Sequence, residues 1–107
     1  MLIAFGAVLG KVNVFVLFVL ATIELFFYAL NEEIGVGVFH ASDMGGSMYV
    51  HTFGAIFGIG VAWMYRPKGY ANVPASSYYN NMFSAIGSIF LWMFWPSFNG
   101  ALASGNS

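Results

Sequence analysis

The chain has 107 residues, of which 60% are hydrophobic and only 7% are charged, and its mean hydropathy is +0.79. An ordinary soluble domain carries about 25% charged residues, so this composition indicates an all-α integral membrane protein that resides in a lipid bilayer. The net charge of −1 gives no indication of a nucleic-acid partner. Because the chain contains no cysteine, disulfides and a thiolate zinc site are excluded.

Hydropathy predicts one partial helix and three full transmembrane helices within a single domain, 1–107. Residues 1–10 are apolar but too short to cross a hydrocarbon core, which takes about 20 helical residues. Their pattern is typical of the end of a helix that starts earlier. Full spans are predicted at 12–34, 43–65 and 77–103. In the last of them a proline, Pro96, is expected to kink the helix or to end its regular part.

The segments between these helices carry the charges that predict an orientation. Segment 31–42 is acidic and glycine-bearing and is predicted to be a loop, whereas Lys11 and loop 66–76 supply the basic residues. By the positive-inside rule, Lys11 and loop 66–76 are expected to be cytoplasmic and loop 31–42 external, in a multi-pass protein of the plasma membrane. At the end of the basic loop, Ser76 and Ser77 are candidates for N-caps of the last helix.

Small and polar residues share one face of the helix predicted at 43–65. At roughly 100° per residue, about a quarter of the circumference holds Asp43, Ser47, His51, Gly54, Gly58 and Ala62. The remaining surface is bulky and apolar. This polar strip is where another helix can approach or where a passage can run. Its glycine pair has GxxxG spacing, for which close helix packing is a sufficient explanation.

His51 is the ionisable residue in the middle of this strip. A charged side chain is costly inside a membrane, so we expect a neutral imidazole that faces the interior of the helix bundle. In one interpretation His51 lines a pore and offers a hydrogen-bond donor and acceptor to something small and polar. In the other it joins two helices by a structural hydrogen bond. The pattern alone leaves both open.

The acidic residues have structural and functional interpretations too. Asp43 is a favoured N-cap and its carboxylate suits the positive end of a helix dipole, with direct cation binding as the lesser alternative. Glu32 and Glu33 raise the local cation concentration or simply end a solvated helix. Glu24, inside an apolar span, must be protonated or paired, and we interpret it as an anchor to a helix outside this chain.

The aromatic residues of the last span are expected to belong to the core or to the lipid-facing belt. They are Phe90, Trp92, Phe94, Trp95 and Phe98. Phe98 differs because it follows the Pro96 break, where a bulky ring can constrict a passage. The next residue, Asn99, is able to bond to unwound backbone.

Catalysis is not predicted. Asp43 and His51 are separated by about 12 Å along a helix, which is too far for a base and the group that orients it. A hydrolase built from these two residues and Ser104 is therefore excluded, and the same separation argues against a metal site with His40. We expect neither a metal nor a cofactor.

Four segments closely resemble the ammonium transporter and Rhesus glycoprotein family, its Rhesus branch in particular. They are FGAVLGKV at 5–12, YALNEE at 28–33, SDMGGSMYVHTFGAIFG at 42–58 and LWMFWPSFN at 91–99. The resemblance implies that the chain is a fragment that runs from the end of the third helix to the sixth in a fold of eleven or twelve helices. It also implies a homotrimer with one pore per subunit.

The resemblance further implies ammonium transport by the full-length protein, with channel-like conduction of NH3 after recruitment of NH4+, while the fragment alone is inactive. His51 corresponds to the first of two pore histidines, and Phe98, followed by Asn99, to one of two stacked phenylalanines that gate the pore. Asp43 and Glu32 correspond to acids at the recruitment site and the vestibule. The alternatives are a non-transporting Rhesus-like structural subunit or a channel for carbon dioxide.

Overall fold

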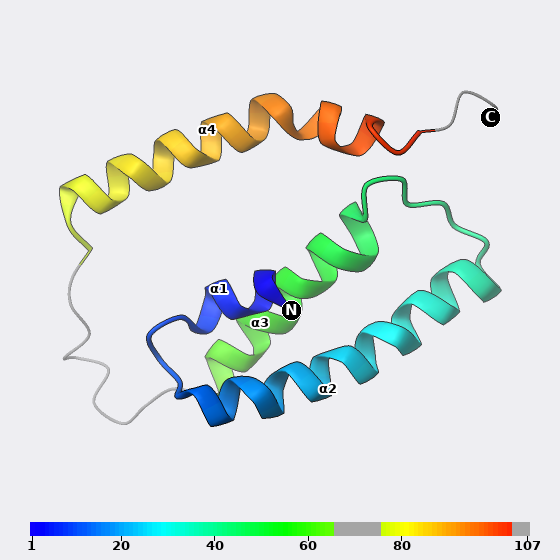
Figure 1. Ribbon diagram of the computed structural model, residues 1–107, viewed down its shortest axis with the longest axis horizontal. Coiled ribbons are helices and arrows are strands. Elements are labelled where there is room, and N and C mark those ends of the chain that lie inside the picture. Colours follow the sequence, from blue (N-terminus) through cyan, green and yellow to red (C-terminus); the bar gives the residue numbers. More distant parts are fainter. Residues whose placement is uncertain (66–75, 104–107) are drawn as a thin grey trace.

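The computed structural model describes residues 1–65 and 76–103, and all regular structure within them is helical (Figure 1). In chain order the elements are α1 (Leu2–Val8), α2 (Val14–Glu32), the π-helix η1 (Glu33–Val38), the π-helix η2 (Ser47–Thr52), α3 (Phe53–Met64) and α4 (Tyr78–Gly100). Among the described residues, Val14–Val38 and Ser47–Met64 are long and apolar enough to cross a membrane. The basic loop expected at 66–76, except for Ser76, and Ser104 lie outside the described residues.

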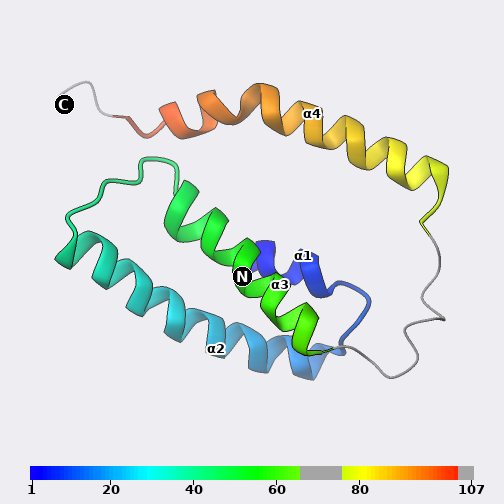
Figure 2. The same ribbon diagram turned by 180° about the vertical axis from the view of Figure 1, so that it is seen from behind.

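The helix η2–α3 lies between α2 and α4, and the short α1 crosses α3, as the views from both sides show (Figures 1 and 2). Buried glycines of α3 allow this crossing to be close. A Cβ atom on Gly58 would lie 2.8 Å from the Cα of Ala4, and one on Gly54 would lie 3.1 Å from the Cβ of Ile3. The glycine pair therefore serves as the surface on which α1 packs.

Helix α2 begins two residues after the start of the predicted span 12–34, and its helical structure ends later than the sequence predicts. Its N-cap is Asn13, whose side-chain oxygen accepts the N–H of Val16 at 2.9 Å. Helical structure then continues through η1 to Val38. The prediction of a loop at 31–42 is therefore wrong over more than half of its length, and the connection to the next helix starts only after Val38.

A contact between the two π-helices explains why this glycine-bearing segment stays helical. Gly35 of η1 is buried, and the ring of Tyr49 from η2 occupies the place that a side chain at this position would take. The wider π-helical turn is closed by a hydrogen bond from the N–H of Phe39 to the carbonyl of Ile34 at 3.1 Å. Glycine here allows a close approach between helices and does not mark a turn.

The histidine-bearing helix starts four residues later than the predicted span 43–65, at Ser47. Its N-cap is Gly46, which has a φ of +68°, in the left-handed region that favours glycine. Asp43 consequently lies in the connection before the helix, and not at its first residue.

Helix α4 confirms Ser77 as an N-cap, because its hydroxyl oxygen accepts the N–H of Asn80 at 3.2 Å. The helix continues on both sides of Pro96 and ends at Gly100, so the proline does not terminate it. Figure 1 shows α4 as an arched helix that approaches the rest of the molecule only near its C-terminal end. That end lies beside η2.

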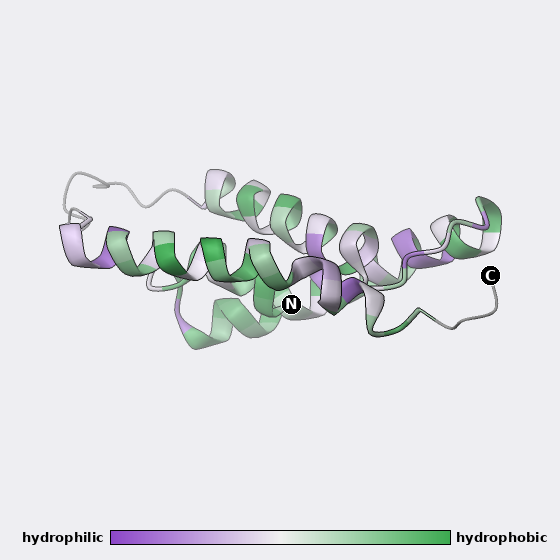
Figure 3. Cartoon of the chain, turned by 90° about the horizontal axis from the view of Figure 1, so that it is seen from above, coloured by the Kyte–Doolittle hydropathy of each residue, from purple (hydrophilic) through white to green (hydrophobic). Residues whose placement is uncertain are grey.

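Large apolar side chains cover the outside of the molecule. Phe15 is 74% exposed and Trp92 is 80% exposed, and the buried apolar residues of the described part are only Ala4 and Val8. Figure 3 shows hydrophobic colouring along most turns of the helices. Such surfaces suit contact with lipid or with further apolar helices and do not suit water.

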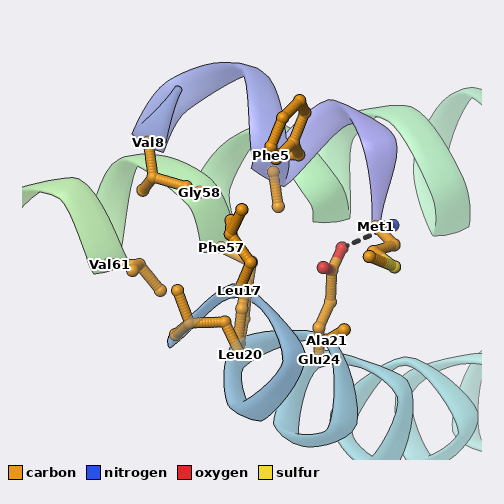
Figure 4. A pocket seen from close by; sticks show the side chains of 11 residues that line it. Met1, Phe5, Val8, Leu17, Leu20, Ala21, Glu24, Phe57, Gly58 and Val61 are labelled. Atoms are coloured by element: carbon orange, nitrogen blue, oxygen red, sulfur yellow. Dashed lines mark ion pairs between the residues drawn. The ribbon is translucent and has the colours of Figure 1, made fainter. Parts of the chain in front are cut away.

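Glu24 is the buried charged residue of the described chain, with only 4% of its surface exposed. It lines a cavity of about 20 Å³, enough for a single water molecule. Its Oε1 lies 2.8 Å from the amino group of Met1, at the start of α1 (Figure 4). Glu24 thus has a charged partner next to α1, and its interpretation as an anchor to a helix outside this chain stays a prediction.

The packing of α1 on α3 yields a prediction. Replacing Gly58 by Ala should destabilise the protein by about 1–3 kcal/mol, because the new methyl group meets backbone atoms of Ala4 that cannot move aside. Gly60→Ala is the matched control, since nothing lies within 4 Å of its Cβ position. The measurement is the midpoint of unfolding of each variant in a titration with a denaturing detergent. Equal unfolding midpoints for Gly58→Ala and Gly60→Ala would contradict this packing.

Candidate functional site

The candidate site lies where η2 meets the C-terminal end of α4, next to the connection that follows η1 (Figures 1 and 2). It brings together three residues predicted from the sequence, namely His51, Phe98 and Asn99. Trp95 joins them through contacts with all three. The site is thus formed by segments about 50 residues apart in the chain.

His51 is held by the carbonyl group of Gly46. This oxygen accepts the N–H of Val50 at 3.0 Å and the N–H of His51 at 2.9 Å, and it also lies 2.9 Å from the imidazole Nδ1. Because a carbonyl oxygen can only accept, Nδ1 must carry the hydrogen. In the neutral imidazole, Nε2 then has a lone pair that can accept an N–H from a small ligand.

Two aromatic rings of α4 enclose the half-buried imidazole on one side. The ring centroid of His51 lies 4.6 Å from that of Trp95 and 5.6 Å from that of Phe98, and both pairs are edge-to-face. The two aromatic rings themselves stack with centroids 5.2 Å apart. Such distances and angles are favourable for aromatic pairs.

Trp95 is the site residue that the sequence reasoning placed elsewhere, in the core or the lipid belt. A signal for it existed, because Trp95 precedes Phe98 by three residues and therefore shares its helix face.

Asn99 links α4 to the start of η2. Its Oδ1 accepts the hydroxyl of Ser47 at 2.6 Å, and its Nδ2 donates to the carbonyl of Trp95 at 3.0 Å. The sequence predicted a bond from Asn99 to unwound backbone. The structure instead shows a bond to a carbonyl one turn earlier in a helix that continues to Gly100.

Asp43 caps η2 from outside the helix. Its Oδ2 accepts the N–H of Met48 at 2.8 Å and that of Tyr49 at 3.0 Å. Asp43 was expected to accept hydrogen bonds from the amides of the first helical turn. It does so, although it lies four residues before Ser47, the first residue of η2. The carboxylate also lies at the positive end of the helix dipole.

Glu32 and Glu33 lie at the same end of the molecule as the site, where α2 passes into η1. The phenol of Tyr28 lies beside Glu32. Glu32 is exposed, and no hydrogen bond in the described part of the chain joins it to His51. The charges of Glu32 and Glu33 contribute a negative potential at this end of the molecule.

The site combines hydrogen-bonding groups with aromatic rings. Residues 1–65 and 76–103 contain no group of three or more His, Cys, Asp or Glu side chains that could hold a metal ion. What the site presents is an imidazole acceptor beside two aromatic faces, with carboxylates nearby. This combination suits a small polar molecule that enters as a cation or as its neutral form.

Comparison with known proteins gives a consistent result. The family model described as "Ammonium Transporter Family" matches residues 1–107. "Ammonium transporter Rh type C" of Tetraodon nigroviridis is 48% identical over 94% of this chain, and that of Xenopus tropicalis is 47% identical over 94%. "Ammonium transporter Rh type A" of Canis lupus familiaris is 47% identical over 95%.

The chain spans only 22–25% of the length of these relatives, whose names describe transporters and not enzymes. No solved structure matches it.

The cap formed by Asp43 can be tested directly. Asp43→Ala should cost about 1–2 kcal/mol locally and speed hydrogen exchange of the Met48 and Tyr49 amides about tenfold, because both lose their acceptor. Asp43→Asn keeps a side-chain oxygen and should have a smaller effect. Hydrogen–deuterium exchange with mass spectrometry measures this difference. Unchanged exchange in Asp43→Ala would show that the carboxylate does not cap the helix.

Proposed function

The chain belongs to the ammonium transporter family, and on that premise we propose that it forms part of a membrane pathway for ammonium or ammonia. The observation that supports this most is the orientation of His51. Its Nδ1 is engaged by the carbonyl of Gly46, so Nε2 remains an acceptor beside the Trp95 and Phe98 rings. Such an acceptor suits the N–H groups of ammonia and of ammonium.

Recruitment is the first step of the proposed pathway. Glu32, Glu33 and Asp43 lie at the same end of the molecule as His51, and together they attract cations to this end. Ammonium is the common form of the substrate at neutral pH and carries the charge that these acids attract. We propose that Glu32 belongs to the vestibule and that Asp43 acts there besides capping η2.

The second step is passage of the neutral molecule. Removing an ion from water costs several kcal/mol even after the protein relaxes, so an apolar passage excludes ammonium much more strongly than ammonia. Phe98 and Trp95 supply the apolar surface, and Nε2 of His51 supplies one hydrogen bond that replaces water. Channel-like conduction of NH3 after recruitment of NH4+ follows from these two properties.

This activity is proposed for a protein of the length of the relatives, because the chain covers about a quarter of them. A homotrimer in the plasma membrane and the contribution of a second histidine and a second gate phenylalanine belong to the same proposal. We place the acidic end outside the cell. In support, Lys11 lies between α1 and α2, at the end of α2 opposite Glu32 (Figure 1).

A structural Rhesus-like subunit without transport and a channel for carbon dioxide are the competing functions. The structural subunit would let neither ammonia nor carbon dioxide cross a vesicle membrane. The carbon dioxide channel would let carbon dioxide cross but not ammonia. Vesicles that contain the full-length protein and a pH-sensitive dye separate the three.

His51→Ala should lower the ammonia flux into such vesicles about tenfold, because the acceptor that replaces water in the passage is lost. His40→Asn is the matched control: His40 lies in the connection before η2 with a φ of 52°, a conformation that asparagine tolerates. The rate of dye response after mixing with ammonium chloride is the measurement. Full flux in His51→Ala would remove His51 from the pathway.

Phe98→Ala should raise the flux of methylammonium relative to ammonium about threefold or more, because a ring that narrows the passage becomes a methyl group. Phe83→Ala removes a ring of the same helix that is 67% exposed, and it controls for the loss of apolar surface. If both variants give the wild-type ratio, Phe98 does not form a constriction.

A further inference from the structure

Ser47 and Asn99 form a connection between helices that the proposed function does not use. In the part of the chain that the structure describes, the bond from Ser47 Oγ to Asn99 Oδ1 is the one hydrogen bond that joins two side chains distant in sequence. It measures 2.6 Å and joins the first residue of η2 to the last turn of α4. Apart from ring contacts, this bond is what links α4 to η2.

The partners of Asn99 fix the orientation of its amide group. Nδ2 lies 3.0 Å from the carbonyl of Trp95, which can only accept. Exchange of Oδ1 and Nδ2 would bring two acceptors together at that carbonyl. Oδ1 therefore faces Ser47, whose hydroxyl must donate to it.

The contact between the end of α4 and the segment before η2 is also tightly packed. The side chain of Asn99 occupies the place that a Cβ would take on Gly45, which is buried. The Cα of Asn99 would lie 2.8 Å from that Cβ. The end of α4 thus lies directly on the backbone before η2, and a side chain at Gly45 would force it away.

The hydrogen bond between Ser47 and Asn99 lies next to the residues of the candidate site. Ser47 precedes His51 by one turn of η2, and Asn99 follows Phe98 directly and bonds to the carbonyl of Trp95. A change in the Ser47–Asn99 bond therefore moves the two aromatic rings relative to the imidazole. No residue of this pair needs to touch the substrate for this to occur.

We propose that Ser47 and Asn99 are positioning residues that hold the Trp95–Phe98 pair against the imidazole of His51, and thereby set the size of the amine that passes beside these three rings. This inference rests on the proposed transport function. The hydrogen bond keeps the three rings in contact, so ammonia fits beside them and an alkylamine is disfavoured.

The test compares the fluxes of ammonium and methylammonium through the full-length protein in vesicles. Ser47→Ala should raise the methylammonium-to-ammonium ratio about fivefold, which is the effect expected from the loss of one hydrogen bond. Ser47→Thr keeps the hydroxyl and should restore a ratio close to that of the wild type. Ser88→Ala is the control in α4, because the Ser88 hydroxyl bonds only to the carbonyl of Ser84 in its own helix.

A double-mutant cycle adds a readout that a general loss of structure would not give. Asn99→Ala should change the ratio at least as much as Ser47→Ala does, because it also removes the bond to the carbonyl of Trp95. The double variant should change the ratio no further than Asn99→Ala alone, because Ser47 has then already lost its partner. Additive effects would overturn the inference, as would an unchanged ratio or a proportional fall of both fluxes. A wild-type protein that conducts neither amine would instead overturn the proposed function on which the inference depends.

Discussion

The carbonyl group of Gly46 is the constraint on which the site depends. With a φ of +68°, Gly46 turns the chain into η2, and its oxygen accepts from the amides of Val50 and His51 and from the imidazole. Asp43 satisfies the amides of Met48 and Tyr49. The free amides of a helix start are costly where water is absent, so these two acceptors are what allow the helix to begin inside a membrane protein.

The same principle of close approach organises the rest of the molecule. Glycine takes part where two segments meet: Gly58 under α1, Gly35 under Tyr49 and Gly45 under Asn99. Lipid offers no hydrophobic driving force between helices, so contact area between closely packed backbones replaces a large apolar core. This explains how a chain that buries few of its apolar side chains still has defined helix contacts.

Much of this arrangement follows from the sequence, and the misses have physical causes. Hydropathy located the two long apolar helices Val14–Val38 and Ser47–Met64. The family resemblance grouped His51, Phe98 and Asn99, which lie together in the structure. The segment after Glu32 was expected to be a loop because glycines and acids signal a turn. Its helical state depends on Tyr49, a residue beyond the next connection, and local propensity contains no information about such a contact. Trp95 was missed because a pore aromatic and a lipid-facing one look alike in a single sequence.

In the proposed pathway the acids and the histidine act on different forms of the substrate, and the surroundings of these residues give the reason. Glu32 is exposed, so its field reaches a cation in water but weakens beyond a Debye length of about 8 Å at physiological ionic strength. His51 is half-buried against two aromatic rings and acts through a hydrogen bond that salt does not screen. In this proposal a cation is attracted at the surface, whereas the cost of removing its water disfavours it in the apolar surroundings of His51. In the same proposal ammonium gives its proton to water between these two positions, so that the cation is attracted to the surface and only neutral ammonia goes on past His51.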